Sequence, residues 1–433
     1  MIWNKIESSP REKIQEVQYN RLKETMDRVY TLTKFYKTKF DKMGIKPDDI
    51  KSINDISKLP FTKKQDLRDH YPFGLFTVPM DEVVRIHSSS GTTGKPTVVG
   101  YTQSDMDVWD EVMARVYTMA GASSKDIVHN AYGYGLFTGG LGFHNGAQKI
   151  GATVIPSSGG FTDRQVMLMK DFGATVLTAT PSFALHMAEC AQKAGNDFKK
   201  DFKLKAGIFG AEPTSEGLKK EVSDAWGIDY HEVYGLSEII GPGVSCSCKH
   251  STSLHFFEDH FYPEIIDADT EEVLPYGQKG ELVITTLTKQ ALPLIRYRTG
   301  DITSLINEPC ECGRTMVRME SIVGRADDMM IINGVNVYPS QVEHVISQTK
   351  GLTLNYQIII DKKGYLDKIN ILVEISDDIM SDSISEIEKI KKDIEQSISN
   401  NLYINACVKL VEPRTIERSM GKAVRIIDNR KKG

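Results

Sequence analysis

The chain has 433 residues, 40% of them hydrophobic, which is enough to fill one large core and one small core. Its 53 basic and 58 acidic residues nearly cancel, and no lysine- or arginine-rich run indicates a surface for nucleic acid. The first residues lack the apolar core of a signal peptide, and no stretch of about 18 apolar residues could span a membrane. We therefore expect a cytoplasmic protein with neither nucleic acid nor membrane among its partners.

Three changes of pattern divide the chain. Apolar side chains recur every three or four positions between residues 10 and 45, which predicts helix. From about 80 to 240, β-rich runs alternate with helical stretches, as in a layered α/β domain whose ligands gather where strands end in loops. Strand-like segments joined by turns then predict a β subdomain at about 245–325. The sequence thus predicts an α/β fold, with a large N-terminal domain over 1–325 and a small α+β C-terminal domain over 326–433.

A run of hydroxyl side chains and glycines follows the β-rich residues 83–87 directly. Glycines let successive N–H groups point into one concavity, and hydroxyls add donors, so the run suits a phosphate. Its Gly-x-x-Gly-Lys spacing, followed by a proline, is not that of a Walker A loop. A flexible linker is the alternative, but linkers are rare between two strands of a packed domain. We predict a phosphate-binding loop made of Ser88, Ser89, Ser90, Gly91, Thr92, Thr93, Gly94 and Lys95.

Four more segments follow this loop in order. They are Tyr-Gly-Leu-Ser-Glu from Tyr234, Tyr-Arg-Thr-Gly-Asp from Tyr297, Gly-Arg-Ala-Asp-Asp from Gly324, and Arg-Ser-Met-Gly-Lys from Arg418. Together the five segments resemble those of adenylate-forming enzymes, the superfamily of acyl-CoA synthetases, luciferases and peptide-synthetase adenylation domains. The resemblance implies that ATP and Mg²⁺ are used to activate a carboxylic acid as an acyl-adenylate, and that the C-terminal domain is mobile.

The chemistry of adenylation gives several of these residues a role, because negative charge gathers around the α-phosphate. Glu238 is expected to hold Mg²⁺, and Asp301 to accept hydrogen bonds from the ribose hydroxyls. Lys422 would place its charge on the substrate carboxylate and the α-phosphate. Asp327 matches the hinge about which the C-terminal domain rotates, although an acidic loop residue with no such role stays an equal alternative. The other residues expected to bind ATP are Gly210, Ala211, Glu212, Pro213, Tyr234, Gly235, Leu236, Ser237 and Arg325.

Within the superfamily the chain most resembles phenylacetate-CoA ligases, through the long segments 59–68, 132–140, 210–213 and 259–265. This resemblance implies coenzyme A as the acceptor and a homodimer. The acid would be phenylacetate first, with indoleacetate, benzoates and cinnamates as alternatives. Transfer of the acyl group to a carrier protein instead of coenzyme A also stays open.

Aromatic residues alternate with glycines in the second of these segments, so flat apolar surface stands beside backbone that can approach closely, as a planar ring requires. Aromatic side chains beside glycines also serve as packing corners, and that interpretation stays open for at least one of them. We predict an acid pocket lined by Tyr132, Tyr134, Phe137 and Gly210.

Six cysteines are too few for a disulfide scaffold of this size, and four of them form two Cys-x-Cys pairs. A set of three thiolates and one imidazole is typical of structural zinc. We predict a zinc site that connects two segments of the β subdomain and takes no part in the reaction. Cys246 could replace Cys248 as a ligand, and four reduced thiols are the plain alternative. The predicted ligands are Cys248, His255, Cys310 and Cys312.

Overall fold

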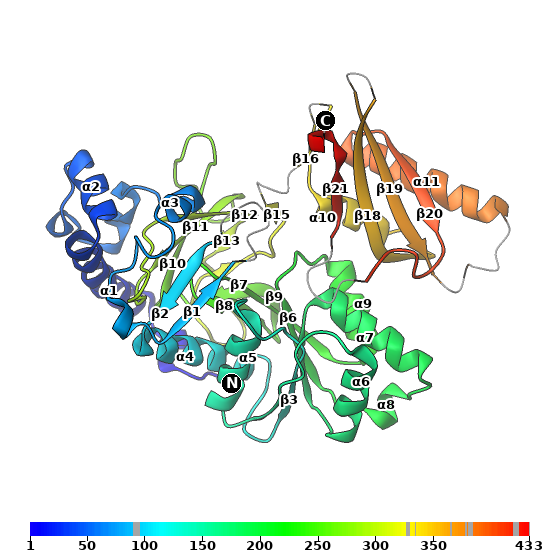
Figure 1. Ribbon diagram of the computed structural model, residues 1–433, viewed down its shortest axis with the longest axis horizontal. Coiled ribbons are helices and arrows are strands. Elements are labelled where there is room, and N and C mark those ends of the chain that lie inside the picture. The colour runs from blue at the N-terminus through cyan, green and yellow to red at the C-terminus, as the bar shows by residue number, and fades with distance from the viewer. Residues whose placement is uncertain are drawn as a thin grey trace.

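The computed structural model describes the whole chain except residues 90–95, 326–329, 334, 364–365, 377–378, 380–383, 419–423 and 433. It confirms the predicted α/β class, with a large N-terminal domain and a smaller C-terminal domain (Figure 1). Within the described part of the chain, no helix is both long and apolar enough to cross a membrane.

The chain begins with helices that cover one end of the N-terminal domain, as the spacing over residues 10–45 predicts. Leu22, Met26 and Val29 on one face of the first helix are fully buried, in a cluster with Tyr36 and Phe40 of the second. Their spacing of three and four residues places them on one side of a helix. These helices are α1 (Arg11–Leu32), α2 (Lys34–Met43) and the shorter α3 (Lys64–Asp69).

A nine-stranded sheet forms the centre of the N-terminal domain, in the order β13-β14-β9-β8-β7-β6-β5-β3-β4. The five strands from β7 to β4 in that order pair in parallel, and the others pair antiparallel. The parallel strands are β3 (Ile127–Asn130), β4 (Thr153–Ile155), β5 (Val176–Ala179), β6 (Ala206–Gly210) and β7 (Asp229–Leu236). The antiparallel ones are β8 (Gly241–Cys248), β9 (Ser251–Phe256), β13 (Leu305–Ile306) and β14 (Arg318–Met319).

Helices cover both faces of this sheet, which explains why β5 and β6 are buried along their whole length. Successive side chains point to opposite faces: Val176 and Ile208 belong to one core, and Leu177 and Phe209 to the other. On the first face lie α4 (Gln103–Met119) and α5 (Gly139–Lys149). On the second lie α6 (Thr162–Asp171), α7 (Pro181–Lys193) and α9 (Glu216–Trp226), with the short α8 (Phe198–Asp201) beside them.

The strands expected between about 245 and 325 divide between two sheets. Part of them joins the antiparallel half of the central sheet, whereas the rest forms a separate four-stranded antiparallel sheet. That sheet contains β10 (Phe261–Ile266), β11 (Gly280–Thr286), β12 (Tyr297–Thr303) and β15 (Gly324–Arg325). A two-stranded hairpin of β1 (Arg85–Ser88) and β2 (Val98–Tyr101) flanks the predicted phosphate loop.

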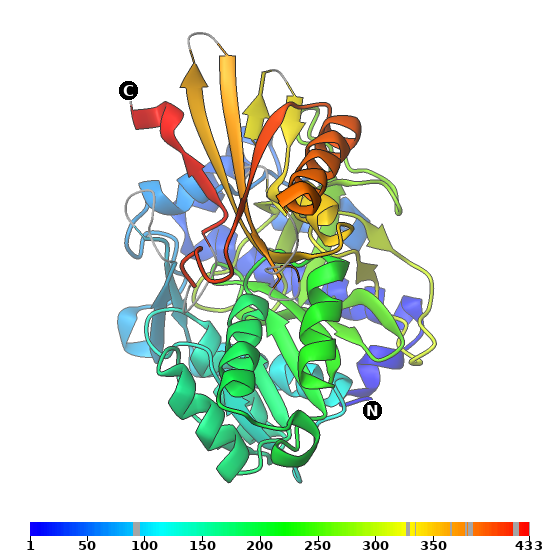
Figure 2. The same ribbon diagram turned by 90° about the vertical axis from the view of Figure 1, so that its right-hand side faces the viewer.

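The C-terminal domain consists of a four-stranded sheet, in the order β20-β19-β18-β21, with two contacting helices on one face (Figure 2). Its side chains share one apolar core with α7 and α9, so the domain sits on these two helices. Its elements are β16 (Met330–Ile332), β17 (Val335–Val337), α10 (Pro339–Ser347), β18 (Leu352–Lys363), β19 (Leu366–Ile375), α11 (Ile384–Leu402), β20 (Ala406–Val411) and β21 (Ile426–Asp428).

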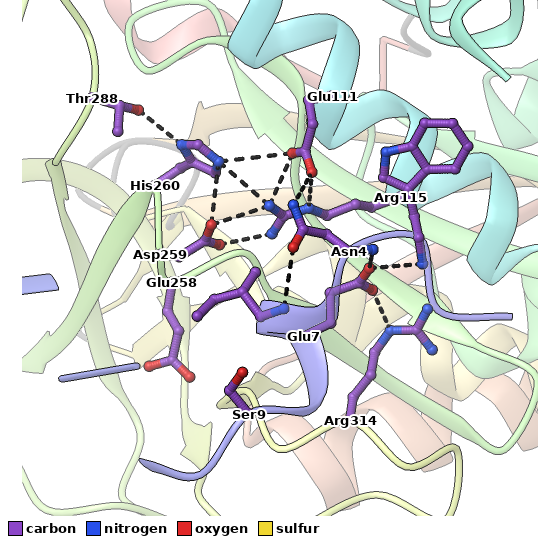
Figure 3. A network of polar contacts seen from close by, with 12 residues as sticks. Asn4, Glu7, Ser9, Glu111, Arg115, Glu258, Asp259, His260, Thr288 and Arg314 are labelled. Atoms are coloured by element: carbon purple, nitrogen blue, oxygen red, sulfur yellow. Dashed lines mark hydrogen bonds and ion pairs between the residues drawn. The ribbon is translucent and has the colours of Figure 1, made fainter. Parts of the chain in front are cut away.

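A buried network of charges connects α4 to the segment before β10 (Figure 3). Arg115 donates from both terminal nitrogens to Asp259, at 2.7 and 3.0 Å, and from Nε to Glu111 at 2.9 Å. Burial opposes ionisation of Asp259, but neighbouring His260 and Arg115 outweigh it and hold the pKa of this carboxyl below its ordinary value. The carboxylate is therefore a buried charge that depends on its partner.

We expect Arg115→Met to lower the free energy of unfolding by about 3 kcal/mol, because it leaves the buried Asp259 carboxylate without its main partner. Arg21, at 3.3 Å from Asp259, compensates in part. All three tryptophans lie in the N-terminal domain, so urea unfolding followed by tryptophan fluorescence measures the effect. The same substitution at the exposed Arg164 on α6 is the control. Equal free energies of unfolding in the two variants would contradict the role of Arg115 as the main partner of the buried Asp259.

Candidate active site

The predicted site residues come together at the carboxyl ends of the parallel strands. Gly210 ends β6, Tyr234 lies near the end of β7, and Tyr132 lies in the loop that follows β3. The Tyr132 hydroxyl donates to the Gly210 carbonyl at 3.3 Å, which joins two of these loops. Ligands of α/β sheets bind at this edge, so the fold itself brings the sequence motifs to one place.

Asp301 on β12 is held from two sides. The Tyr234 hydroxyl donates to its Oδ2 at 2.6 Å, and Arg325 Nη1 lies 3.5 Å from its Oδ1. Burial, together with the charge of Asp301, raises the pKa of Tyr234 well above its ordinary value, so the phenol keeps its proton and donates it. An ionised carboxylate that can only accept hydrogen bonds, fixed in this way, suits a pair of sugar hydroxyls.

Glu238 follows β7 and is only 6% exposed. Lys64 Nζ, from α3, lies 3.9 Å from its carboxylate, and Tyr297 is buried beside it. Burial, and then the charge of Glu238, raises the pKa of Tyr297 well above its ordinary value. One carboxylate suits Mg²⁺, which usually takes one or two protein carboxylates and completes its shell with water and phosphate oxygens. Ser237, the residue before, has its Oγ 3.4 Å from Thr138 Oγ1.

The segment 210–213 is a sharp turn after β6. Ala211 adopts φ 71°, a backbone conformation that costs a non-glycine residue about 1 kcal/mol or more and often marks a functional site. A Cβ on Gly210 would lie 2.2 Å from the Val233 carbonyl oxygen, so glycine is required where β6 and β7 approach. Glu212 accepts from the Ser182 N–H at 2.6 Å, at the start of α7, and with Pro213 lines a cavity of about 200 Å³ against the C-terminal domain.

The three predicted aromatic residues have different environments. Tyr132 is 4% exposed and stacks on Phe143, with ring centres 4.6 Å apart. It therefore also packs in the core, the alternative role that the sequence allowed for one of these aromatic residues. The Tyr134 hydroxyl accepts from Asn130 Nδ2 at 2.8 Å and lies 3.0 Å from His144 Nδ1. Phe137 is 47% exposed.

The structure adds one residue that the sequence motifs missed. His87, on β1, is 1% exposed, and its Nδ1 lies 3.0 Å from the Leu136 carbonyl, which also accepts from Ser88 N–H at 3.0 Å. The entry to the phosphate loop is thereby joined to the aromatic segment. Within the predicted loop, the Ser89 N–H donates to the Thr97 carbonyl and the Thr97 N–H donates to Ser89 Oγ, both at 3.0 Å. The residues 90–95, Asp327 and Lys422 lie outside the described part of the chain.

The four predicted zinc ligands lie together. Their ligand atoms, from Cys248, His255, Cys310 and Cys312, are all within 4.8 Å of one another. Cys248 Sγ is 3.7 Å from Cys310 Sγ, and Cys312 Sγ is 3.4 Å from His255 Nε2. Among the described residues this cluster contains Cys248 and not Cys246, whose thiol donates to the Ser247 carbonyl. The donor set and its compactness fit a tetrahedral ion.

Arg314 connects this cluster to the start of the chain. Its Nη1 lies 3.6 Å from Cys312 Sγ, its Nε donates to the buried Glu7 at 2.6 Å, and its Nη2 donates to the Met1 carbonyl at 2.7 Å. A cationic donor beside a thiolate favours its ionised form, the form that binds metal.

Comparison with known proteins agrees with this geometry. Residues 22–288 match the family described as AMP-binding enzyme, and residues 334–430 match the AMP-binding enzyme C-terminal domain. The phenylacetate-coenzyme A ligase of Thermus thermophilus is 48% identical over 98% of this chain and 99% of its own length. The chain belongs to this ligase family. The enzyme of the same name from Escherichia coli is 45% identical over 98% of this chain and 97% of its own, so the resemblance drawn from the sequence motifs is confirmed.

Solved structures of 2-hydroxyisobutyryl-CoA ligase provide a second comparison. The postadenylation state with R3-HIB-AMP has TM-score 0.92 at 29% identity, and covers 99% of this chain and 92% of that one. The same enzyme in the thioesterification state with 2-HIB-AMP and CoA has TM-score 0.73 at 30% identity and the same coverage. Because identity and coverage hardly differ, the scores indicate that the two domains of this chain are arranged more as in the postadenylation state than as in the thioesterification state.

Gly210→Ala should lower the melting temperature, because its Cβ would clash with backbone at the site; such overpacking costs about 1–3 kcal/mol. Gly133→Ala, at a position where a new Cβ would meet nothing within 4 Å, is the matched control and should melt like the original. Thermal unfolding of both variants measures this difference. An unchanged melting temperature in Gly210→Ala would show that the turn can widen to accept the added Cβ.

Proposed function

We propose that this ligase converts an aryl carboxylic acid, with phenylacetate as first choice, into its coenzyme A thioester through an acyl-adenylate, releasing AMP and pyrophosphate. The observation that carries the proposal is the Asp301 carboxylate, fixed by Tyr234 and Arg325 at the edge where nucleotides bind in α/β folds. The names of the full-length relatives support the choice of acid and acceptor.

In the first step an oxygen of the substrate carboxylate attacks the α-phosphorus of ATP, and the bond from that phosphorus to the pyrophosphate oxygen breaks. Asp301 holds the ribose so that the α-phosphate faces the acid, and the loop Ser88–Lys95 binds the leaving phosphates. Glu238 would hold Mg²⁺, which when bound neutralises phosphate charge. Lys422 adds a charge at the reacting oxygens.

In the second step the sulfur of coenzyme A attacks the acyl carbonyl, the carbon–oxygen bond to AMP breaks, and the thiol proton leaves. We take residues 1–325 as the adenylation domain and 326–433 as the mobile domain, with Asp327 as the hinge between the two arrangements. The two TM-scores against one ligase in two states support such a rotation.

The acid pocket would lie between the aromatic segment and the turn at Gly210. Tyr132 contacts the Gly210 carbonyl and supplies a flat wall, and the exposed Phe137 has room to close on a ring. Zinc at Cys248, His255, Cys310 and Cys312 would stabilise the antiparallel half of the central sheet without entering either step. A homodimer in the cytoplasm remains part of the proposal through the family resemblance.

The decisive experiment is AMP release by the purified protein with ATP, Mg²⁺ and coenzyme A, over a panel of acids. We expect phenylacetate to give the highest kcat/KM. Acetate or palmitate should give a kcat/KM at least about a hundredfold lower, since a pocket shaped for an aromatic ring gains little binding energy from either acid. Indoleacetate, benzoate and cinnamate test the alternatives. Preference for acetate or palmitate would refute the aryl pocket, and AMP release without consumption of free coenzyme A would favour a carrier protein.

Metal analysis tests the zinc site. The original protein should contain about one zinc per chain, and Cys248→Ala should lose it and melt at a lower temperature, because three ligands hold zinc far less tightly than four. Cys246→Ala removes a neighbouring buried thiol that is not in the cluster, and should keep its zinc. Less than half an equivalent in the original protein would refute the site.

A further inference from the structure

Arg418 makes two kinds of ion pair. Within its own domain it pairs with Glu374 on β19, Nη1 to Oε1 and Nη2 to Oε2, both at 2.8 Å. Across the domain boundary its Nη2 donates to Glu189 Oε1, on α7, at 3.3 Å. The Glu374 side chain is 1% exposed, whereas those of Arg418 and Glu189 are 16% and 31% exposed.

The pair with Glu374 already satisfies Arg418. It is bidentate and short, and Glu374 also accepts from the Ile416 N–H at 2.8 Å, so this part of the C-terminal domain is held from within. Arg418 is therefore paired within its own domain without Glu189. What its contact adds is a bond between the domains in the present arrangement.

Glu189 is charged and aimed at the boundary. Burial disfavours its ionised form, but His186 and Arg418 outweigh this and lower the pKa of Glu189 below its ordinary value. The two domains also meet at the start of α9. A Cβ on Gly217 of α9 would lie 2.6 Å from Ser347 Cβ of α10, and Ser215 N–H donates to Glu343 at 3.3 Å.

The position of Arg418 in the chain gives this pair its importance. Residues 419–423, which include the proposed catalytic Lys422, follow it directly, and Arg425 comes just after them. Arg425 is anchored by the carbonyls of Leu354 and Tyr356, at 2.9 and 3.4 Å. Of the two flanking arginines, Arg418 is thus the one that bonds directly to a side chain of the N-terminal domain.

We propose that Glu189 is a positioning residue for the adenylation half-reaction: its ion pair with Arg418 stabilises the present arrangement of the C-terminal domain, which resembles the one in which 2-hydroxyisobutyryl-CoA ligase holds its acyl-adenylate. The proposal rests on the proposed function. Because Glu374 stays paired with Arg418, the ion pair between Arg418 and Glu189 can break at each turnover without leaving a buried charge unpaired. The pair therefore favours one arrangement without preventing the other.

The test separates the two half-reactions. In Glu189→Gln, pyrophosphate exchange with the acid and ATP should slow about fivefold, the size expected for a partly exposed ion pair. Thioester formation from a preformed acyl-adenylate and coenzyme A should keep its rate or gain slightly. Lys422→Ala serves as the reference for a lost first step, and Glu16→Gln is the matched control, since it removes an exposed ion pair with Lys13 on α1 of the N-terminal domain.

The possible outcomes are distinct. Equal slowing of both half-reactions in Glu189→Gln, or a lowered melting temperature, would show a merely structural role and overturn the proposal, as would an unchanged exchange rate. Absence of exchange in the original protein would instead refute the proposed function.

Discussion

One carboxylate joins the parts of this protein that must act together. Asp301 belongs to the four-stranded sheet, its partner Tyr234 belongs to the central sheet, and Arg325 is the last described residue before the C-terminal domain begins its own strands. Because β12 and β15 pair Asp301 directly with Arg325, the guanidinium reaches the carboxylate from the neighbouring strand. The proposed nucleotide site and the proposed domain junction therefore share one charge pair.

Short sequence motifs predicted most residues of this candidate site. Tyr234, Glu238 and Asp301 were predictable because each lies in a short motif, and the fold class followed from the alternation of strands and helices. Strand pairing was not predictable in the same way. The late strands β13 and β14 join the central sheet beside β9, whereas β10, β11 and β12, which lie between them in sequence, form a separate sheet, because pairing depends on partners distant in sequence.

The choice between Cys246 and Cys248 as a zinc ligand shows why strand register could not be predicted from the sequence. Two residues apart on a strand, they should point to the same face. The register of β8 against β9 shifts between Ser247 and Cys248, so Cys246 stands opposite His255 and Cys248 opposite Ser251. Both thiols lie in the same apolar core, but this irregularity brings only Cys248 to the four-residue cluster, and no periodicity in the sequence predicts it. His87 was missed for a related reason, since its partner is a backbone carbonyl 49 residues away.

The contact between Arg314 and the Met1 carbonyl has a practical meaning for anyone who produces this enzyme. Met1, Cys248 and Cys312 line one cavity of about 440 Å³, so residues fused ahead of Met1 would emerge beside the four predicted zinc ligands. A polyhistidine tag placed there would bring additional imidazoles to that opening, where they would compete for any ion that this cluster binds and disturb the arginine that borders it. Purification tags for metal work on this protein belong at its other end.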